Sequence, residues 1–577
     1  MTATASLSEA SAPSRFALRM PRMSPLVMVL SALLIALVIP PAIFLVRVSL
    51  YEAAPDGSLQ GFTLRFYKEL WTGRFFLPSL YNSIVYAIGS ALLAIVIGTA
   101  QALIVERTNA PGRKLVLFGA IISLGVPHVL YTVSWLLLLG RSGPLNQFLA
   151  WAISPDATLN VYSMWGMILI EGLGFVPLTF LLMSAILKSN DAAFEEAAMM
   201  AGASPMRSFM RITLPLAFPA FCALLLLIFV RAIESFEVPA LVGLAGNINV
   251  ITTTIYQNTS AKGVANYGQA GAYSVCLVII VAALLLWQGK LSRQAHRFQT
   301  ITGKGFRPRV ISLGRGRWVA SGVLFLLFFL VTLLPVSLLV FTSFQPFFEG
   351  VSMEAFRRST LENYALLLEP GAFQDSIVNT LLLGIGTASL VVPFTALCAW
   401  LVARRAAGAT MLDQVATLPL VFPAIILSVA FLELYVRSPI PLYGTLLSIV
   451  IASSMRFLPY GMRYAYAGAL QVHSDLEEAA TSAGAGRMRL FVRILLPLLS
   501  SSLISSWLLI FLMSVQTVSL PLLLVGPGSE IMAVTLFHLW ENGQVNELAA
   551  MGVVWIGLMT AVSTIFHMLT RRWHLNS

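Results

Sequence analysis

The chain has 577 residues, of which 58% are hydrophobic and 11% are charged, and its mean hydropathy is +0.84. A soluble protein carries about a quarter charged residues, so this composition excludes a water-soluble globular protein. The net charge of +11 is compatible with nucleic-acid binding, but basic loops beside membrane helices set topology and contact lipid headgroups, so we expect the lipid bilayer and no nucleic acid as a partner.

Apolar runs of spanning length follow one another along the chain, separated by short polar segments. The runs are continuously apolar, unlike the alternating strands of a membrane barrel. We therefore predict an all-α polytopic membrane protein with about 12 transmembrane helices. The predicted spans are 25–47, 78–104, 115–140, 162–187, 217–244, 269–289, 318–342, 376–402, 413–436, 446–469, 498–525 and 547–569.

Lysine and arginine are unevenly distributed between the loops that connect these spans. Placing both termini in the cytoplasm assigns most of the 36 basic residues to cytoplasmic segments, as the positive-inside rule requires. The segment 290–317 contributes most to this asymmetry, because it is rich in Lys and Arg and has no acidic residue.

The first apolar run is longer than the apolar region of a signal peptide, so we expect an uncleaved first span. The cysteines Cys222, Cys276 and Cys398 fall in predicted spans without metal-ligand spacing, so we expect no metal site.

Two polar stretches carry the same pattern, displaced by 282 residues: Glu-Ala-Ala, three residues, Gly, nine residues, Ile, one residue and Leu-Pro. Further matches occur upstream at a displacement of 297, including Asn82-Ser83 with Asn379-Thr380 and Arg107 with Arg404. Six spans therefore repeat as six more in the same orientation, as a parallel duplication. The repeated stretches consist of Glu196, Ala197, Ala198, Gly202, Ile212, Leu214 and Pro215, and of Glu478, Ala479, Ala480, Gly484, Ile494, Leu496 and Pro497.

The first repeated stretch has the residues of a helix, a bend and a second helix. Residues 195–201 favour a helix, with acidic residues in its first turn, and Gly202 permits a change of direction that a residue with a Cβ would resist. Ser204 and Pro205 then provide a helix start. The loops 105–114 and 403–412 share little beyond Arg107 and Arg404, so duplication alone does not account for the stronger identity here. We infer a functional constraint on the two Glu-Ala-Ala stretches.

This pattern resembles the EAA loop of inner-membrane permeases in type I ABC importers, which are binding-protein-dependent transporters. The resemblance covers nearly the whole chain and implies two permease domains, 25–289 and 318–577, after a cytoplasmic segment 1–24 and joined by a basic linker 290–317. It further implies a bacterial inner-membrane location and a translocation pathway for a solute delivered by an extracytoplasmic binding protein. Glu196–Gly202 and Glu478–Gly484 would then be coupling helices that dock on cytoplasmic ATPase subunits, which form a dimer.

The chain lacks the phosphate-binding motif GxxxxGK[ST]. We therefore expect a permease that is not itself an enzyme and that holds no cofactor, with ATP and Mg bound by the partner ATPase.

Span five contains the candidate pathway residues Arg231, Glu234 and Glu237, which we place on roughly one helical face. At a displacement of 282 their counterparts are Met513, Gln516 and Ser519, so only the first half is charged there. These residues either flank the translocation pathway, together with Gln516 and Ser519, or form an internal Arg231–Glu234 ion pair that joins the bundle. We expect neutralising partners for the same network, and we expect His128 to be a satisfied bundle residue. The expected neutralising partners are Glu171, Arg456 and Arg463.

The sequences of residues 234–239 and of the linker 302–309 resemble those of the iron(III) importer permeases most. Importers of thiamine, 2-aminoethylphosphonate and polyamines are close relatives, so these substrates remain alternatives. A 12-helix secondary transporter would explain the parallel repeat but not the two Glu-Ala-Ala stretches. A membrane-embedded enzyme lacks support, because the sequence shows no nucleophile and base set.

Overall fold

The computed structural model describes residues 24–53, 59–189, 192–260, 265–297, 310–369 and 371–576. Within these ranges the chain is a helical bundle with one antiparallel hairpin, β1 (Tyr51–Ala53) and β2 (Leu59–Phe62). The predicted all-α class is therefore confirmed. Most of the predicted segment 1–24 and residues 298–309 of the basic linker lie outside the described residues.

The first half begins at α1, where Ser24 accepts a hydrogen bond from the Val27 amide (3.3 Å) and Pro25 occupies the first helical position. Its long helices correspond to predicted spans, and shorter helices connect them. The elements are α1 (Pro25–Leu50), α2 (Arg65–Thr72), α3 (Phe76–Arg107), α4 (Arg113–Gly125), α5 (His128–Leu139), α6 (Pro144–Ala152), α7 (Met164–Ser189), α8 (Ala192–Met200), α9 (Pro205–Ser208), η1 (Phe209–Thr213), α10 (Leu214–Ile233), η2 (Pro239–Gly243), α11 (Ile251–Ser260) and α12 (Tyr267–Arg297).

The second half repeats this order with small differences in its short elements. Its elements are α13 (Gly316–Phe328), η3 (Phe329–Leu333), α14 (Leu334–Ser343), α15 (Met353–Arg357), α16 (Glu362–Leu368), α17 (Ala372–Ala403), α18 (Ala409–Thr417), η4 (Leu418–Val421), α19 (Ala424–Val436), α20 (Leu446–Gln471), α21 (Ser474–Ser482), α22 (Arg487–Leu490), η5 (Phe491–Leu495), α23 (Leu496–Gln516), η6 (Pro521–Leu523), α24 (Met532–Glu541) and α25 (Val545–Asn576).

Among the described residues nine helices are long and apolar enough to cross a membrane, or ten if the pair 409–421 and 424–436, bent by 105°, is one span. The predicted number of twelve is thus not confirmed. The third predicted span is divided into α4 and α5 at Pro127, and a proline interrupts the backbone hydrogen bonds of a helix. The tenth predicted span is α20, which carries Arg456 and Arg463 and is therefore less apolar.

Each half is organised around one closely packed helix pair, α3 with α7 and α17 with α20. In the first pair a Cβ on Gly98 would lie 2.8 Å from the Thr179 Cβ. In the second pair a Cβ on Gly461 would lie 2.6 Å from the Thr395 Oγ1. Gly98 corresponds to Thr395 and Thr179 to Gly461, so the two halves fill the same contact with the small and the large residue exchanged. The duplication is therefore visible in the packing as well as in the motifs.

The matching Asn-Ser and Asn-Thr pairs hold equivalent backbone segments. The Ser83 hydroxyl accepts a hydrogen bond from the Ile251 amide (2.9 Å) at the start of α11, and the Thr380 hydroxyl accepts one from the Met532 amide (2.8 Å) at the start of α24. Asn82 donates to the Asn249 carbonyl at 3.0 Å. These contacts explain why the pairs recur: each second span anchors the short helix that follows the fifth span of its half.

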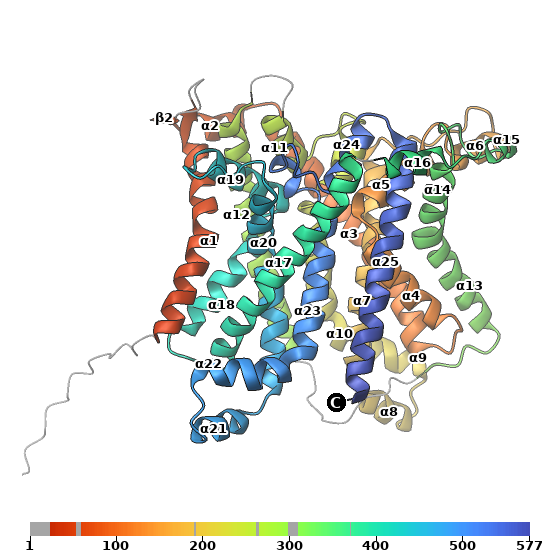
Figure 1. Ribbon diagram of the computed structural model, residues 1–577. Helices are drawn as coiled ribbons and strands as arrows, with labels where there is room; N and C mark the ends of the chain where they lie inside the picture. Colours follow the sequence, from red (N-terminus) through yellow and green to blue (C-terminus); the bar gives the residue numbers. More distant parts are fainter. Residues whose placement is uncertain are drawn as a thin grey trace, which may run out of the picture.

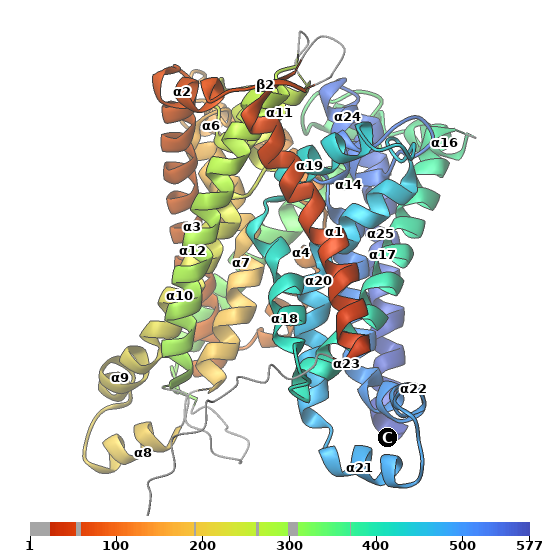
Figure 2. The same cartoon turned by 90° about the vertical axis from the view of Figure 1, so that its left-hand side faces the viewer.

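The first helix of each half packs against both its own half and the other half. Helix α1 packs against α12 of its own half and against α18 and α19 of the second half, and Figure 2 shows it lying across that half. Correspondingly, α14 packs against α5 of the first half as well as against α25. The sequence repeat therefore does not coincide with two self-contained bundles, because each half uses its first helix to cover the other.

The fifth span of each half is broken. Helix α10 ends at Ile233 and a non-helical segment precedes η2, so the continuous helix predicted for 217–244 is wrong. Helix α23 ends at Gln516 before η6 in the same way. Pro239 and Pro521 begin the short elements, where a missing backbone N–H costs little. Non-helical backbone at membrane depth is tolerated where it is buried in protein or lines a cavity.

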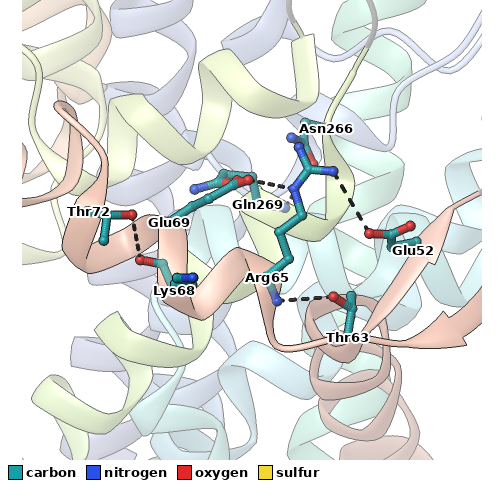
Figure 3. Close-up of polar contacts among 8 residues, drawn as sticks. All are labelled: Glu52, Thr63, Arg65, Lys68, Glu69, Thr72, Asn266 and Gln269. Carbon is teal, nitrogen blue, oxygen red and sulfur yellow. Dashed lines mark hydrogen bonds and ion pairs between the residues drawn. The ribbon is translucent and has the colours of Figure 1, made fainter.

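The two ends of the bundle differ. Figure 1 shows α8 and α21 at the lower end, where α25 also ends, and α2, α11, α16 and α24 at the upper end. At the upper end Arg65 of α2 lies between Glu69 (2.6 Å) and Glu52 of β1 (3.9 Å), close to Asn266 and Gln269 beside the start of α12 (Figure 3). These exposed charges attach α2 to the hairpin, and surface pairs of this kind contribute little to stability.

Candidate functional site

The Glu-Ala-Ala stretches form the matching helices α8 and α21. Gly202 follows α8 with φ +88° and Gly484 follows α21 with φ +82°. The Ala203 amide donates to the Ala198 carbonyl (3.0 Å), and the Ala485 amide donates to the Ala480 carbonyl (3.0 Å). This hydrogen bond and the left-handed glycine are the marks of a Schellman C-cap, in which glycine avoids the cost of a Cβ. The predicted bends at Gly202 and Gly484 are therefore confirmed.

Both helices present small side chains to solvent. Ala197 and Ala479 are exposed, Ala198 and Ala480 are half-buried, and Glu478 is exposed. Glu196 belongs to α8, but its side chain lies outside the described part of the structure. The exposed alanines leave room for another backbone to approach, and Figures 1 and 2 agree that α8 and α21 lie on opposite sides of the lower end.

A second helix follows each bend. The Ser204 hydroxyl accepts a hydrogen bond from the Arg207 amide (3.3 Å), so the predicted start of α9 at Ser204 and Pro205 is confirmed. Short π-helical segments, η1 and η5, then lead into α10 and α23. The chain thus forms helix, bend and helix before re-entering the bundle in both halves.

The two halves meet inside the bundle at Glu237 and Ser519. The Ser519 hydroxyl donates to the Glu237 carboxylate at 2.7 Å, and these two residues occupy equivalent positions, 282 apart. Equivalent residues can touch in this way only where they lie at the axis that relates the halves. The structure therefore brings two of the predicted pathway residues together at the centre of the interface.

Arg231 reaches across the same interface to the second half. Its guanidinium donates to the Tyr460 hydroxyl of α20 at 2.9 Å. Arg231 and Glu234 are both half-buried, and no ion pair joins them among the residues that the structure describes. The two side chains therefore lie within electrostatic range of one another without a direct ion pair. Because α10 ends at Ile233, Arg231, Glu234 and Glu237 also do not share one helical face.

The remaining predicted partners divide into buried and exposed groups. Arg456 is half-buried and lies within electrostatic range of Glu234, as predicted. Arg463 is exposed on α20, so the expectation that it neutralises this network is wrong. Gln516 donates to the Gly125 carbonyl (3.2 Å) at the break between α4 and α5, which ties the fifth span of one half to the third span of the other.

Glu171 and His128 lie deeper in the first half. Glu171 is fully buried, and neither of its carboxylate oxygens has a hydrogen-bond partner among the described residues. His128 Nδ1 is likewise buried without such a partner, which corrects the expectation of a satisfied histidine. In the described ranges no three His, Cys, Asp or Glu residues converge into a group that could hold a metal ion.

An aromatic cluster joins the halves nearer the upper end, and the sequence reasoning missed it. Phe236 lies in the break after α10, Tyr256 on α11 and Phe537 on α24. Their ring centroids are 5.2 Å (Phe236–Tyr256), 6.0 Å (Phe236–Phe537) and 6.4 Å (Tyr256–Phe537) apart. Phe236 and Phe537 are essentially inaccessible. Aromatic residues are frequent throughout this apolar chain, so no local signal distinguished these three.

Comparisons with known proteins agree with this architecture. The chain matches the family described as binding-protein-dependent transport system inner membrane component over residues 94–295 and 392–574. The ferric transport system permease protein FbpB of Actinobacillus pleuropneumoniae is 27% identical over 501 residues, 84% of this chain and 70% of that protein. A putative ferric transport system permease protein FbpB 1 of Haemophilus influenzae is 28% identical over 477 residues, 80% of this chain and 72% of that protein.

Shorter relatives match one half. A putative 2-aminoethylphosphonate transport system permease protein PhnV of Salmonella paratyphi A is 25% identical over 242 residues, 42% of this chain and 88% of that protein. A solved bacterial ABC transporter involved in the import of the acidic polysaccharide alginate matches 46% of this chain and 94% of that chain, with a TM-score of 0.40 and 21% identity. The family matches the chain twice, once in each half. The chain therefore belongs to the binding-protein-dependent transport system inner membrane components and is an ABC importer permease with two copies of the family unit.

Proposed function

We propose that this permease is the membrane subunit of an iron(III) importer and that α8 and α21 are its docking helices for a dimer of ATPase subunits. The observation that supports this most directly is the matched geometry of the two helices. Each ends at a left-handed glycine, exposes small side chains and lies at the same end of the bundle. One such surface in each half suits a partner that is itself a dimer.

The proposed topology follows from the same helices. The lower end of Figure 1, where α1 begins and α25 ends, is then cytoplasmic, and the upper end receives the extracytoplasmic binding protein. The distribution of Lys and Arg supports this orientation. ATP and Mg belong to the ATPase subunits in this scheme, and the permease contributes docking and the route for the solute.

The proposed route runs along the interface between the halves. Arg231, Glu234 and Glu237 flank it from the first half, and Gln516 and Ser519 flank it from the second. Ionisable groups in a membrane interior are costly, which supports a functional role for the half-buried charges. The aromatic cluster Phe236, Tyr256 and Phe537 closes the route toward the upper end, while the docking helices lie on opposite sides of the lower end. We infer that drawing α8 and α21 together on the ATPase dimer separates these rings.

Iron(III) as the cargo is supported by the two relatives named as ferric transport permeases, each of which matches most of the chain. The half-length relative named for 2-aminoethylphosphonate supports that phosphonate as the second candidate. Selectivity in this proposal lies with the binding protein, so the permease passes the cargo without holding it in a ligand set of its own.

The test is reconstitution in proteoliposomes with the partner ATPase subunits and a binding protein. We expect uptake of radioactive iron(III) from the loaded binding protein that requires ATP and all three components. Liposomes without the ATPase and liposomes with unloaded binding protein are the controls. Uptake without any ATPase subunit would contradict the docking proposal, and ATP-dependent uptake of 2-aminoethylphosphonate but not of iron would replace the cargo.

A further inference from the structure

Each docking helix is attached to its half by the same buried ion pair. Arg107, the last residue of α3, donates to Glu195 of α8 at 2.9 Å and also to the Leu187 carbonyl of α7 at 3.2 Å. In the second half Arg404, directly after α17, donates to Glu477 of α21 at 2.8 Å through Nε. It also donates to the Val472 carbonyl, directly after α20, at 2.8 Å. One arginine therefore holds three elements together in both halves.

These pairs are well shielded from solvent. The side chains of Arg107 and Glu195 are 4% and 11% exposed, and those of Arg404 and Glu477 are 26% and 13% exposed. Buried pairs are screened little by salt, and removing one partner leaves an uncompensated charge. A contact of this kind holds a helix in one orientation, whereas a surface pair does not.

Among the described residues, the docking helices pack mainly on short neighbouring elements. Helix α8 packs mainly on α9 and η1, and α21 packs mainly on α22, the short elements that follow the glycine bends. The arginine pairs therefore connect the docking helices directly to the second and fourth spans. Those spans form the most closely packed pair of each half.

Neighbouring carboxylates on α21 have different environments. Glu477 points into the pair with Arg404, whereas Glu478 is exposed. Successive helical residues are about 100° apart around the axis. Fixing the first carboxylate therefore decides which face, with Glu478 and Ala479, is turned outward. The sequence shows both acidic residues but not this division between them.

We propose that Arg107 and Arg404, with Glu195 and Glu477, are positioning residues that orient the docking helices and transmit their movement to the spans. This inference rests on the proposed docking function. We call the pair Arg107–Glu195 the first clamp and the pair Arg404–Glu477 the second clamp.

The two clamps have different surroundings. Beside the first clamp, buried Glu106 lies 3.2 Å from Lys188 and 3.3 Å from Arg113. The backbone of Ile311, just before the second half, donates to the Arg107 carbonyl at 2.8 Å. The first clamp is therefore also bonded to the segment that links the halves.

In the second half, Ala403 and Leu470 occupy the positions that correspond to Glu106 and Lys188. Trp400 instead donates to Glu477 at 3.1 Å. Glu477 would keep this donor on loss of Arg404.

The first measurement uses the permease alone in lipid nanodiscs, with the three cysteines replaced. A spin label at Met200→Cys or at the equivalent Ser482→Cys reports the mobility of α8 or α21, and both positions are exposed. We expect Arg107→Met to increase label mobility on α8 and Arg404→Met to increase it on α21. Arg207→Met and Arg489→Met are matched controls, because these equivalent arginines are exposed on α9 and α22.

The second measurement uses the complete complex and compares solute transported with ATP hydrolysed. We expect Arg107→Met to lower this ratio about tenfold while the ATPase still co-purifies, because displacement of a positioned group by about 1 Å has effects of this size or larger. Glu195→Gln, which keeps the shape of the side chain, should act in the same direction. Arg107→Lys, which keeps the charge, should recover part of the ratio.

Unchanged label mobility and an unchanged ratio in Arg107→Met, equal to Arg207→Met, would overturn the positioning role. Loss of ATPase binding with unchanged mobility would also overturn it, because Arg107 would then belong to the docking surface. Failure of the docking proposal itself has a separate sign. Cysteines placed at exposed Ala197 and Ala479 would then form no cross-link to the ATPase even when both clamps are intact.

Discussion

The two halves are closely similar at the lower end of the molecule but differ at the interface inside the bundle. At the lower end the halves agree in detail, since Gly202 and Gly484 have nearly the same φ and both docking helices end in the same hydrogen bonds. Inside, equivalent positions differ in charge, as in Glu234 and Gln516. Under the proposed docking function each half contacts one copy of an identical partner at the lower end, which keeps the halves alike there. Inside the bundle the halves face one another and can diverge.

The divergence inside has a geometrical consequence. Glu237 and Ser519 touch at the axis between the halves, and two glutamates in that contact would repel at hydrogen-bond distance. One carboxylate with one hydroxyl satisfies the position instead. A route at the junction of two fused halves can therefore be asymmetric even when the parts that receive energy are not.

The largest effect is expected where the halves agree most closely. Gly202→Val or Gly484→Val forces a β-branched residue into a left-handed conformation, at a cost of about 1–2 kcal/mol, although no atom lies within 4 Å of the added Cβ. We expect the bend to be lost and transport per ATP to fall about tenfold or more, with membrane insertion unchanged. Uptake and ATPase rates in proteoliposomes measure this.

Two variants sharpen the glycine prediction. Gly202→Asn should be milder than Gly202→Val, because asparagine tolerates the left-handed region. Gly486→Ala is the matched control for Gly484→Val, since Gly486 is exposed in the loop that contains Gly484, has open space around it and has no positive φ. Parental transport in both valine variants would show that the bends are not needed for coupling.

A smaller effect, on stability, is expected at the contact between the second and fourth spans, where both halves pair a glycine with a threonine but on opposite helices. Gly98→Thr places a Cβ 2.8 Å from the Thr179 Cβ and should destabilise the α3–α7 contact by about 1–3 kcal/mol. Adding Thr179→Gly recreates the arrangement of Thr395 and Gly461, so the double variant should recover most of the loss. Thermal unfolding of the purified permease in detergent measures both. A double variant no more stable than Gly98→Thr would show that the two contacts are not equivalent.

The smallest effect is expected where the halves disagree. Glu234→Gln makes the two halves alike at this position and should reduce transport and substrate-stimulated ATPase activity severalfold, whereas Glu234→Asp should stay closer to the parent. Adding Gln516→Glu should not restore transport, because Met513 and Gly174 stand where Arg231 and Arg456 would be needed. Unchanged transport and stimulation in a folded, correctly inserted Glu234→Gln variant would remove Glu234 from the route.

Much of this architecture could be predicted from local sequence signals. Apolar runs specify helices of spanning length. The helices α8 and α21 and their bends follow from Glu-Ala-Ala and a glycine, and the start of α9 follows from Ser204 and Pro205, because capping and positive φ depend on neighbouring residues. The breaks after α10 and between α4 and α5 were missed, although Pro239 lies in the predicted span 217–244 and Pro127 in the predicted span 115–140. Apolarity alone does not separate a continuous helix from a broken one.

Contacts between residues far apart along the chain could not be predicted in this way. The sequence showed that Arg107 recurs as Arg404, but not that each arginine meets the carboxylate before the Glu-Ala-Ala motif. It likewise placed Glu237 and Ser519 at equivalent positions without showing that they touch. The arginine pairs depend on how the helices of one half pack together. The contact between Glu237 and Ser519 depends on how the two halves are rotated against one another, and that rotation is set by packing over the whole interface.

By itself, the sequence determined that this protein is a helical membrane protein duplicated in parallel, with a matching helix and glycine bend in each half, because composition, periodicity and glycine conformation act over short stretches of chain. Only the tertiary structure decided that α1 and α14 also pack against the opposite halves, that Arg231 meets Tyr460, and that the rings of Phe236, Tyr256 and Phe537 pack together. These choices join residues far apart along the chain, and their free energy comes from burial and partner satisfaction that exist only once the helices are packed.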